Sequence, residues 1–273
     1  MSSHNQLRRL TAPEIAARKG REKIVCLTAY TAPIAELLDP HVDLLLVGDS
    51  VGMVLHGLPT TVGVTLDMMV MHGQAVMRGS SHALVVVDLP FGSYERSPQQ
   101  AHESAVTLMR ETGCQAVKVE SGEGIAQTIS FLVERGIPVV GHVGLRPQAT
   151  NVDGGFKAKG RSTAERERVI AEARATDQAG AFAIVVEGVA ADLADEITRA
   201  VDAPTIGIGA SPQCDGQILV TDDMLGLFDW TPKFVRRYGN LRETISQAAQ
   251  GYARDVRSGD FPGKAELYTL KIG

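Results

Sequence analysis

The stretch Asp43-Leu44-Leu45-Leu46-Val47-Gly48-Asp49-Ser50 decides the fold, because a continuous apolar run stops there at a carboxylate. The run is short, rich in leucine and valine, and flanked by Pro40 and Gly48. These features predict a strand that is buried on both faces, as parallel sheets require. A carboxylate at the end of such a strand, here Asp49, points into the space that the strand ends surround.

The same pattern recurs at four other places, where a mainly apolar run ends at a polar side chain. The runs are residues 84–87 before Asp88, 116–119 before Glu120, 137–141 before His142, and 182–186 before Glu187. Five strand ends therefore carry five groups that can bind a metal ion or move a proton.

Strands and helices alternate along the chain without a linker, which predicts βα repeats around a parallel sheet. We expect strands at residues 24–29, 43–48, 84–88, 116–120, 138–142, 182–187, 204–208 and 217–220. We expect helices at residues 31–38, 65–78, 97–113, 123–135, 163–179, 190–200 and 241–256, and loops at 52–63 and 144–160.

Eight strands predict an α/β fold of the (β/α)8 TIM barrel type, with an open doubly wound sheet as the alternative. The polar groups follow many strands and are not confined to one switch point, which favours the barrel. All strand carboxyl ends of a barrel meet at one face. Residues far apart in the sequence would then share one pocket.

We expect one barrel domain over residues 1–273, with additions at both ends. Residues 1–10 predict a loose tail, and Thr11-Ala12-Pro13-Glu14 is a capping-box start for a short helix that stops at Gly20. The tail and helix occupy residues 1–20, and the helix could plug the bottom of the barrel. A helical extension is expected over about residues 236–273.

The composition excludes several classes of protein. A formal net charge of -5 and an aromatic content of 5% argue against a nucleic-acid partner. No apolar stretch approaches the roughly 20 residues that span a bilayer, and residues 1–9 lack the apolar segment of a secretion signal. The three cysteines Cys26, Cys114 and Cys214 suggest reduced thiols. We therefore expect a cytoplasmic protein with no membrane partner.

Known motifs for other chemistries do not occur in the sequence. It has no Gly-x-x-x-x-Gly-Lys-[Ser/Thr] loop, no Gly-x-Ser-x-Gly elbow and no Cys-x-x-Cys pair. Nucleotide hydrolysis, serine-hydrolase chemistry and zinc binding are unsupported.

Asp49 and Asp88 have two interpretations. Each could cap the helix that follows its strand, a common role for aspartate. Both follow runs of aliphatic residues, however, which places them at strand ends where two carboxylates would repel without a cation between them. Oxygen ligands of this kind favour Mg²⁺.

Lys118 and Glu120 are two residues apart, so they share one face of their strand. Two charges in an otherwise apolar run indicate that this face meets a polar interior. They could form a structural ion pair; alternatively, Glu120 serves the metal, directly or through water, and Lys118 a substrate anion. His142 could likewise be structural or functional. Glu187 is either the partner of a cation or a general base.

Together, several stretches of the chain resemble the ketopantoate hydroxymethyltransferase family. They are Leu27-Thr28-Ala29-Tyr30, Val47-Gly48-Asp49-Ser50-Val51-Gly52-Met53, Asp88-Leu89-Pro90-Phe91, Val117-Lys118-Val119-Glu120, Gly141-His142-Val143-Gly144-Leu145, Pro147-Gln148, Gly154-Gly155-Phe156-Lys157 and Asp215-Gly216-Gln217-Ile218-Leu219-Val220. The resemblance implies a barrel of the phosphoenolpyruvate/pyruvate type, Mg²⁺ dependence and a homo-oligomer, typically a decamer.

The resemblance also implies a reaction and a role for each matching residue. The family transfers a hydroxymethyl group from 5,10-methylenetetrahydrofolate, a folate co-substrate, to the oxo-acid 3-methyl-2-oxobutanoate, which forms ketopantoate for pantothenate and coenzyme A. By this resemblance Glu187 is the proton acceptor. The metal residues are Asp49, Asp88 and Glu120, and the residues around the oxo-acid are Asp49, Ser50, Asp88, Lys118 and His142.

The chain departs from the family's usual motifs at Thr31, Ser121, Arg146 and Ser211, none of which is a metal or base residue. Two rival functions remain. A carbon-carbon lyase or phosphonate mutase of the related barrels would share the Mg²⁺ and oxo-acid site, but lyases generally need a reactive loop cysteine. A non-catalytic paralogue could keep the barrel, although charges buried without a task are costly.

Overall fold

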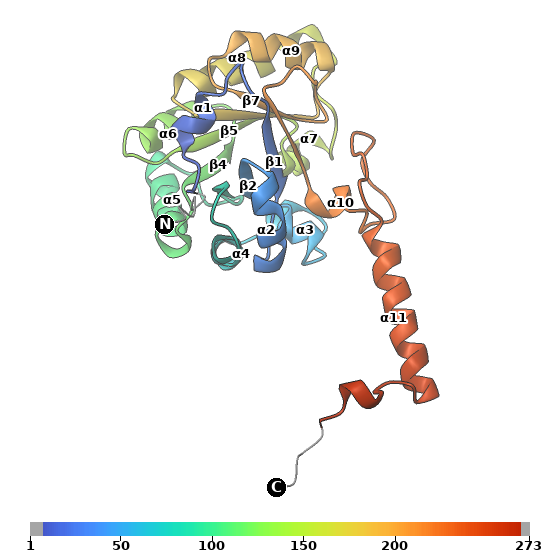
Figure 1. The fold of residues 1–273 in the computed structure, drawn as a ribbon. Helices are drawn as coiled ribbons and strands as arrows, with labels where there is room; N and C mark the ends of the chain where they lie inside the picture. The colour runs from blue at the N-terminus through green and yellow to red at the C-terminus, as the bar shows by residue number, and fades with distance from the viewer. Residues whose placement is uncertain (1–7, 269–273) are drawn as a thin grey trace. The chain divides into compact units, whose positions relative to one another are not determined.

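A computed structural model describes residues 8–268 and contains a closed barrel of eight parallel strands (Figure 1). Each strand pairs with its neighbours in sequence, and β8 closes the ring by pairing with β1. The strands are β1 Ile24–Thr28, β2 Leu44–Val47, β3 Leu84–Asp88, β4 Ala116–Glu120, β5 Val139–Gly144, β6 Ala183–Glu187, β7 Thr205–Ile208 and β8 Gly216–Leu219. The predicted barrel is confirmed and the open sheet is excluded.

Helices connect the strands around the outside of the barrel (Figure 1). The helices between strands are α2 Ala32–Leu38, α3 Val51–Val54, α4 Leu66–Gly79, α5 Pro98–Thr112, α6 Ile125–Val133, α7 Thr150–Asp153, α8 Thr163–Gln178 and α9 Ala191–Ala200. Three further helices lie outside this series: α1 Ala12–Ala16 precedes β1, and α10 Thr221–Met224 and α11 Leu241–Ser258 follow β8. Short 3-10 turns occur at η1 Asp39–His41, η2 Thr61–Gly63, η3 Pro147–Ala149 and η4 Lys264–Glu266. All seven predicted helices occur, each within two residues at either end.

Side-chain alternation along the strands separates an inner core from an outer one. Leu44 and Leu46 of β2 belong to the cluster inside the barrel, whereas Leu45 and Val47 belong to the layer between strands and helices. The same alternation puts Lys118 and Glu120 on the opposite face of β4 from Val117 and Val119, which pack in the outer layer. The polar residues at the strand ends thus belong to the alternate side chains that point into the barrel.

The predicted helix near the N-terminus packs against the barrel interior. Ile15 of α1 is fully buried and joins the inner cluster with Ile24 and Cys26. The helix starts with the predicted capping box, in which the Glu14 carboxylate accepts from the backbone N–H and the hydroxyl of Thr11. Residues 1–7 of the expected tail lie outside the described residues.

Two expectations about local structure were wrong. Strand β5 does not end at His142 but continues to Gly144, so His142 lies within the strand. Gly144 has a φ of +95°, and a Cβ there would lie 2.3 Å from the Glu187 carbonyl oxygen. Only glycine fits this turn. The expected loops at 52–63 and 144–160 contain the short helices α3 and α7.

The chain forms two compact units, with the boundary between Thr221 and Asp222. This boundary precedes the start of the C-terminal extension that the sequence suggested near residue 236. The second unit contains α11, which has no buried residue. Within residues 8–268 no helix has both the length and the apolar character to cross a bilayer.

Candidate active site

A cavity of about 100 Å³ opens at the carboxyl ends of the strands. Since one water occupies about 30 Å³ of liquid, only a small molecule fits inside. The cavity brings together every site residue that the sequence suggested, namely Asp49, Ser50, Asp88, Lys118, Glu120, His142 and Glu187. Apolar side chains complete the walls, among them Leu46, Val185, Ile208 and Ile218.

Asp88 is the centre of the carboxylate cluster. Its Oδ2 accepts the backbone N–H of Asp49 at 3.0 Å, and its Oδ1 lies 3.1 Å from Nζ of Lys118. The register of the sheet pairs Asp88 directly with Lys118 on the neighbouring strand. Asp88 therefore does not cap a helix as the alternative interpretation suggested; its carboxylate faces the other charged groups of the cavity.

The cavity has an excess of negative charge, because four carboxylates and one ammonium line it. Burial and the charge of Asp88 raise the pKa of Asp49 to about 7, although Lys118 and Gln148 oppose the shift. Burial and Asp49 also raise the pKa of Glu120 well above its usual range. Burial alone would lower the pKa of Lys118, but the surrounding carboxylates raise it, so this side chain stays charged.

His142 lies between two carboxylates. Its Nε2 is 3.2 Å from Oε2 of Glu187, and its Nδ1 is 3.9 Å from Oε1 of Glu120. Burial and the nearby Lys118 ammonium lower the pKa of His142, which favours the neutral imidazole. A neutral ring beside Glu187 can orient that carboxylate without neutralising it.

Ser50 lies at the first turn of α3, where its Oγ is 2.8 Å from the hydroxyl of Tyr30. This contact orients the serine hydroxyl at the edge of the cavity. Tyr30 stands in one of the motifs quoted above, but no pattern in the sequence connects it with Ser50.

Two buried residues that the sequence did not single out lie beside the site: Gln148 contacts its carboxylates, and Tyr94 contacts Gln148. Gln148 donates from Nε2 to Oδ2 of Asp49 at 2.8 Å, and its backbone N–H donates to Glu120. The hydroxyl of Tyr94 donates to Oε1 of Gln148 at 2.7 Å. Gln148 was visible only as a motif residue, and Tyr94 gives no sequence signal.

The residues of the cavity fit a divalent cation. Five buried side-chain atoms of the described residues have no aligned hydrogen bond, and three are in this cavity: Oδ1 of Asp88 and both ring nitrogens of His142. Oδ1 of Asp88 lies 3.1 Å from Lys118 and Nε2 of His142 lies 3.2 Å from Glu187, but neither contact has the alignment of a hydrogen bond, so these atoms keep capacity for a ligand. No three acidic, histidine or cysteine side chains within residues 8–268 form a metal cage by themselves. Mg²⁺ does not need such a cage, since it binds one or two protein carboxylates and keeps several waters.

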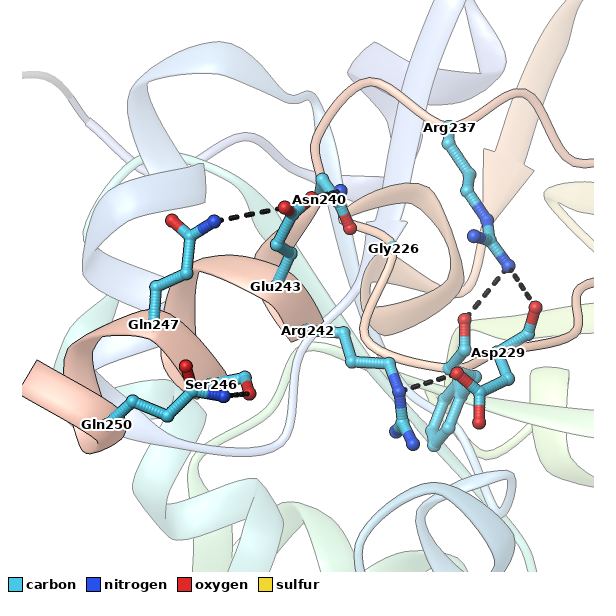
Figure 2. Close-up of a pocket in the computed structure, with 10 residues that line it drawn as sticks. Gly226, Asp229, Arg237, Asn240, Arg242, Glu243, Ser246, Gln247 and Gln250 are labelled. Carbon is cyan, nitrogen blue, oxygen red and sulfur yellow. Dashed lines mark hydrogen bonds and ion pairs between the residues drawn. The ribbon is translucent and has the colours of Figure 1, made fainter.

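A second hollow, of about 510 Å³, lies within the C-terminal unit and is lined by residues of α11 and of the segment before it (Figure 2). Its charged groups have partners within the same segment: Arg242 pairs with Asp229, Arg237 donates to backbone carbonyls, and Glu243 accepts from two side-chain amides. Nε of Arg242 lies 2.6 Å from Oδ1 of Asp229, and Arg237 donates to the Asp229 carbonyl at 2.9 Å. Because these groups are paired and exposed, the strand-end cavity is the better candidate for catalysis.

Comparison with known proteins identifies the family. The model of the ketopantoate hydroxymethyltransferase family matches residues 9–264. A curated 3-methyl-2-oxobutanoate hydroxymethyltransferase from Phenylobacterium zucineum is 70% identical over 275 residues, and the match covers 100% of each chain. The likeness therefore extends over the C-terminal unit as well as the barrel.

Two solved structures of other enzymes have similar folds. A 2,3-dimethylmalate lyase of the PEP mutase/isocitrate lyase superfamily has a TM-score of 0.59 at 14% identity, covering 95% of this chain and 92% of its own. Phosphonopyruvate hydrolase in complex with oxalate and Mg²⁺ has a TM-score of 0.57 at 16% identity, covering 96% and 93%. These similarities show that the chain shares the barrel fold of these enzymes.

Proposed function

Since the chain belongs to the ketopantoate hydroxymethyltransferase family and is thus a transferase, we propose that it hydroxymethylates 3-methyl-2-oxobutanoate with 5,10-methylenetetrahydrofolate. The observation that carries this proposal is the meeting of Asp49, Asp88 and Lys118 with Glu187 in one small cavity. Such a cavity suits a short branched oxo-acid, whose anionic oxygens need cationic partners.

Asp49 and Asp88 would hold Mg²⁺, with Glu120 contacting it through water. When bound, this ion would supply positive charge that stabilises negative charge developing on the ketone oxygen of the substrate. The excess of carboxylates in the cavity supports this assignment, because it leaves one ammonium against four acids. The oxalate and Mg²⁺ bound by phosphonopyruvate hydrolase, a protein of similar fold, agree with it.

Glu187 would remove the proton from C3 of the oxo-acid. Its carboxylate lies 3.2 Å from His142, which can hold it in a fixed orientation while the proton moves. Lys118, charged and buried beside Asp88, would stabilise the negative oxygens of the enolate that results. The enolate carbon would then form a bond to the one-carbon unit, while both carbon–nitrogen bonds between that unit and the folate break and water supplies the hydroxyl oxygen. The two folate nitrogens take one proton from C3 and one from the water. The products are tetrahydrofolate and an oxo-acid whose quaternary carbon carries a hydroxymethyl group.

A lyase remains the nearest alternative within this type of barrel. Lyases of the related barrels generally use a reactive loop cysteine. All three cysteines of the chain are buried, and none lines the cavity. Burial also raises the pKa of Cys26 and Cys114, which disfavours the reactive thiolate. This geometry favours the transferase over a cysteine-dependent lyase.

The decisive experiment is an assay of ketopantoate formation from 3-methyl-2-oxobutanoate and 5,10-methylenetetrahydrofolate. We expect product in the presence of Mg²⁺ and none after chelation, with recovery when Mg²⁺ is returned. Absence of product under all conditions would reject the reaction and leave the non-catalytic alternative. On the family resemblance we also propose that the protein is cytoplasmic and forms a homo-oligomer. Light scattering can measure the molar mass of that oligomer.

A further inference from the structure

Gln148 is a buried residue that joins segments far apart in the sequence. It lies in η3, after β5, and its side chain contacts groups at the ends of β2 and β3. It lies 99 positions after Asp49 in the sequence. Pro147 precedes it at the start of the 3-10 turn and limits the backbone freedom of the segment.

The hydrogen bonds of Gln148 determine how its amide is oriented. Nε2 donates to Oδ2 of Asp49 at 2.8 Å and to the carbonyl of Leu89 at 3.0 Å. Oε1 accepts from the hydroxyl of Tyr94 at 2.7 Å. A flipped amide would place its oxygen against two acceptors, so only this orientation is compatible with the surroundings.

The hydroxyl of Tyr94 is oriented in the same way. It accepts the backbone N–H of Glu120 at 3.3 Å, and its own proton points to Gln148. The backbone N–H of Gln148 in turn lies 3.1 and 3.2 Å from the two carboxylate oxygens of Glu120. The side chains of Tyr94 and Gln148 are both buried, so water does not compete for these bonds.

We propose that Gln148, oriented by Tyr94, is a positioning residue that fixes the Asp49 and Glu120 carboxylates for the cation and the oxo-acid. This inference rests on the proposed function for the identity of the ligands. Its physical basis is the amide donor on Asp49 together with the backbone donor on Glu120. Without the side-chain donor, Asp49 would be free to rotate away from the repelling charge of Asp88.

The test uses the full-length protein and the variants Gln148→Leu and Tyr94→Phe. Titration calorimetry with Mg²⁺ alone should show a Kd about 10- to 100-fold higher in Gln148→Leu, as expected when a partner of a metal ligand is lost. Tyr94→Phe removes one hydrogen bond from the amide and should raise the Kd about fivefold. The KM for the oxo-acid should rise about tenfold or more, and the KM for the folate should stay within about twofold.

Gln115→Leu is the matched control. Gln115 also bridges two segments, since it accepts from Val85 N–H at 3.0 Å and donates to the Gly113 carbonyl at 2.8 Å, but it precedes β4 at the other end of the strand. It should leave the Mg²⁺ affinity unchanged. A wild-type Kd in Gln148→Leu with a lowered melting temperature would overturn the positioning role.

Two further outcomes separate this inference from the proposed reaction. If the wild-type protein makes no ketopantoate, but Gln148→Leu still weakens Mg²⁺ binding, the reaction is wrong and the positioning role stands. If Gln148→Leu does not fold, Tyr94→Phe decides: a Mg²⁺ Kd equal to that of the wild type would overturn the inference, and a higher Kd would support it.

Discussion

Asp88 and Lys118 face each other across neighbouring strands, with Nζ of Lys118 3.1 Å from Oδ1 of Asp88. Both side chains are nearly inaccessible to solvent. A buried ammonium among carboxylates balances only part of their charge, so the cavity attracts a further cation and still presents one donor to an anion. The Asp88–Lys118 pair therefore agrees with both proposed ligands, the Mg²⁺ cation and the oxo-acid anion.

Replacing Lys118 tests the anion-binding half. In Lys118→Met the oxo-acid should bind roughly ten- to 100-fold more weakly, because a charge-assisted hydrogen bond contributes about 1.5–3 kcal/mol. Calorimetry with 3-methyl-2-oxobutanoate at saturating Mg²⁺ measures this change. Lys23→Met is the control, because Lys23 precedes β1 and so lies at the strand end away from the cavity. Equal oxo-acid affinities in Lys118→Met and Lys23→Met would reject the role of Lys118.

Replacing Asp88 tests the cation-binding half. Asp88→Asn keeps the shape of the side chain but removes its charge, so the Mg²⁺ Kd should rise at least about tenfold. Asp67→Asn, on the exposed first turn of α4, should bind Mg²⁺ like the wild type. Unchanged affinity in Asp88→Asn would remove Asp88 from the proposed metal residues.

The role of Glu187 is tested by proton exchange. Glu187→Gln should keep Mg²⁺ and oxo-acid binding but slow exchange of the C3 proton in deuterated water by about 10²–10⁴-fold, because the base is lost. Proton NMR of 3-methyl-2-oxobutanoate without folate follows this step. Glu196→Gln, on α9, is the control. Wild-type exchange in Glu187→Gln would show that another group is the base.

The environment of Asp215 predicts that the folded protein loses stability at acid pH, independently of catalysis. Burial alone would raise its pKa, but the N–H groups of Thr205 and Gly20 and the Lys19 ammonium lower it in the folded state. A carboxyl whose pKa is lower in the folded state than in the unfolded state stabilises the fold. Its contribution is complete at a pH above the unfolded-state pKa, near 3.8, and is lost as the pH falls through the folded-state pKa.

We expect Asp215→Asn to lose about 1–3 kcal/mol of unfolding free energy at pH 7, since a buried acceptor of several hydrogen bonds is weakened. The difference from the wild type should shrink as the pH falls below about 4. Urea unfolding at pH 7 and pH 3 measures both values. Asp202→Asn, which is exposed, should match the wild type, and a difference for Asp215→Asn that does not depend on pH would contradict the linkage.

Much of the site followed from the strands alone. Asp88, Glu120 and Glu187 end apolar runs of alternating orientation, and that periodicity is a local property that the sequence displays directly. The exact end of β5 did not follow, because β pairing with β6 extends that strand beyond His142. No change of composition marks the boundary between the two compact units at Thr221.

The sequence by itself determined the barrel and the inward direction of its polar strand ends, because side chains two residues apart on a strand point to the same face. Only the tertiary structure decided that Gln148 donates to the Asp49 carboxylate and accepts from Tyr94. It also decided that His142 lies beside Glu187. Those contacts join distant segments through particular side-chain orientations and the path of a loop. Side-chain orientations and loop paths do not repeat periodically along the chain, so no local sequence pattern encodes these contacts.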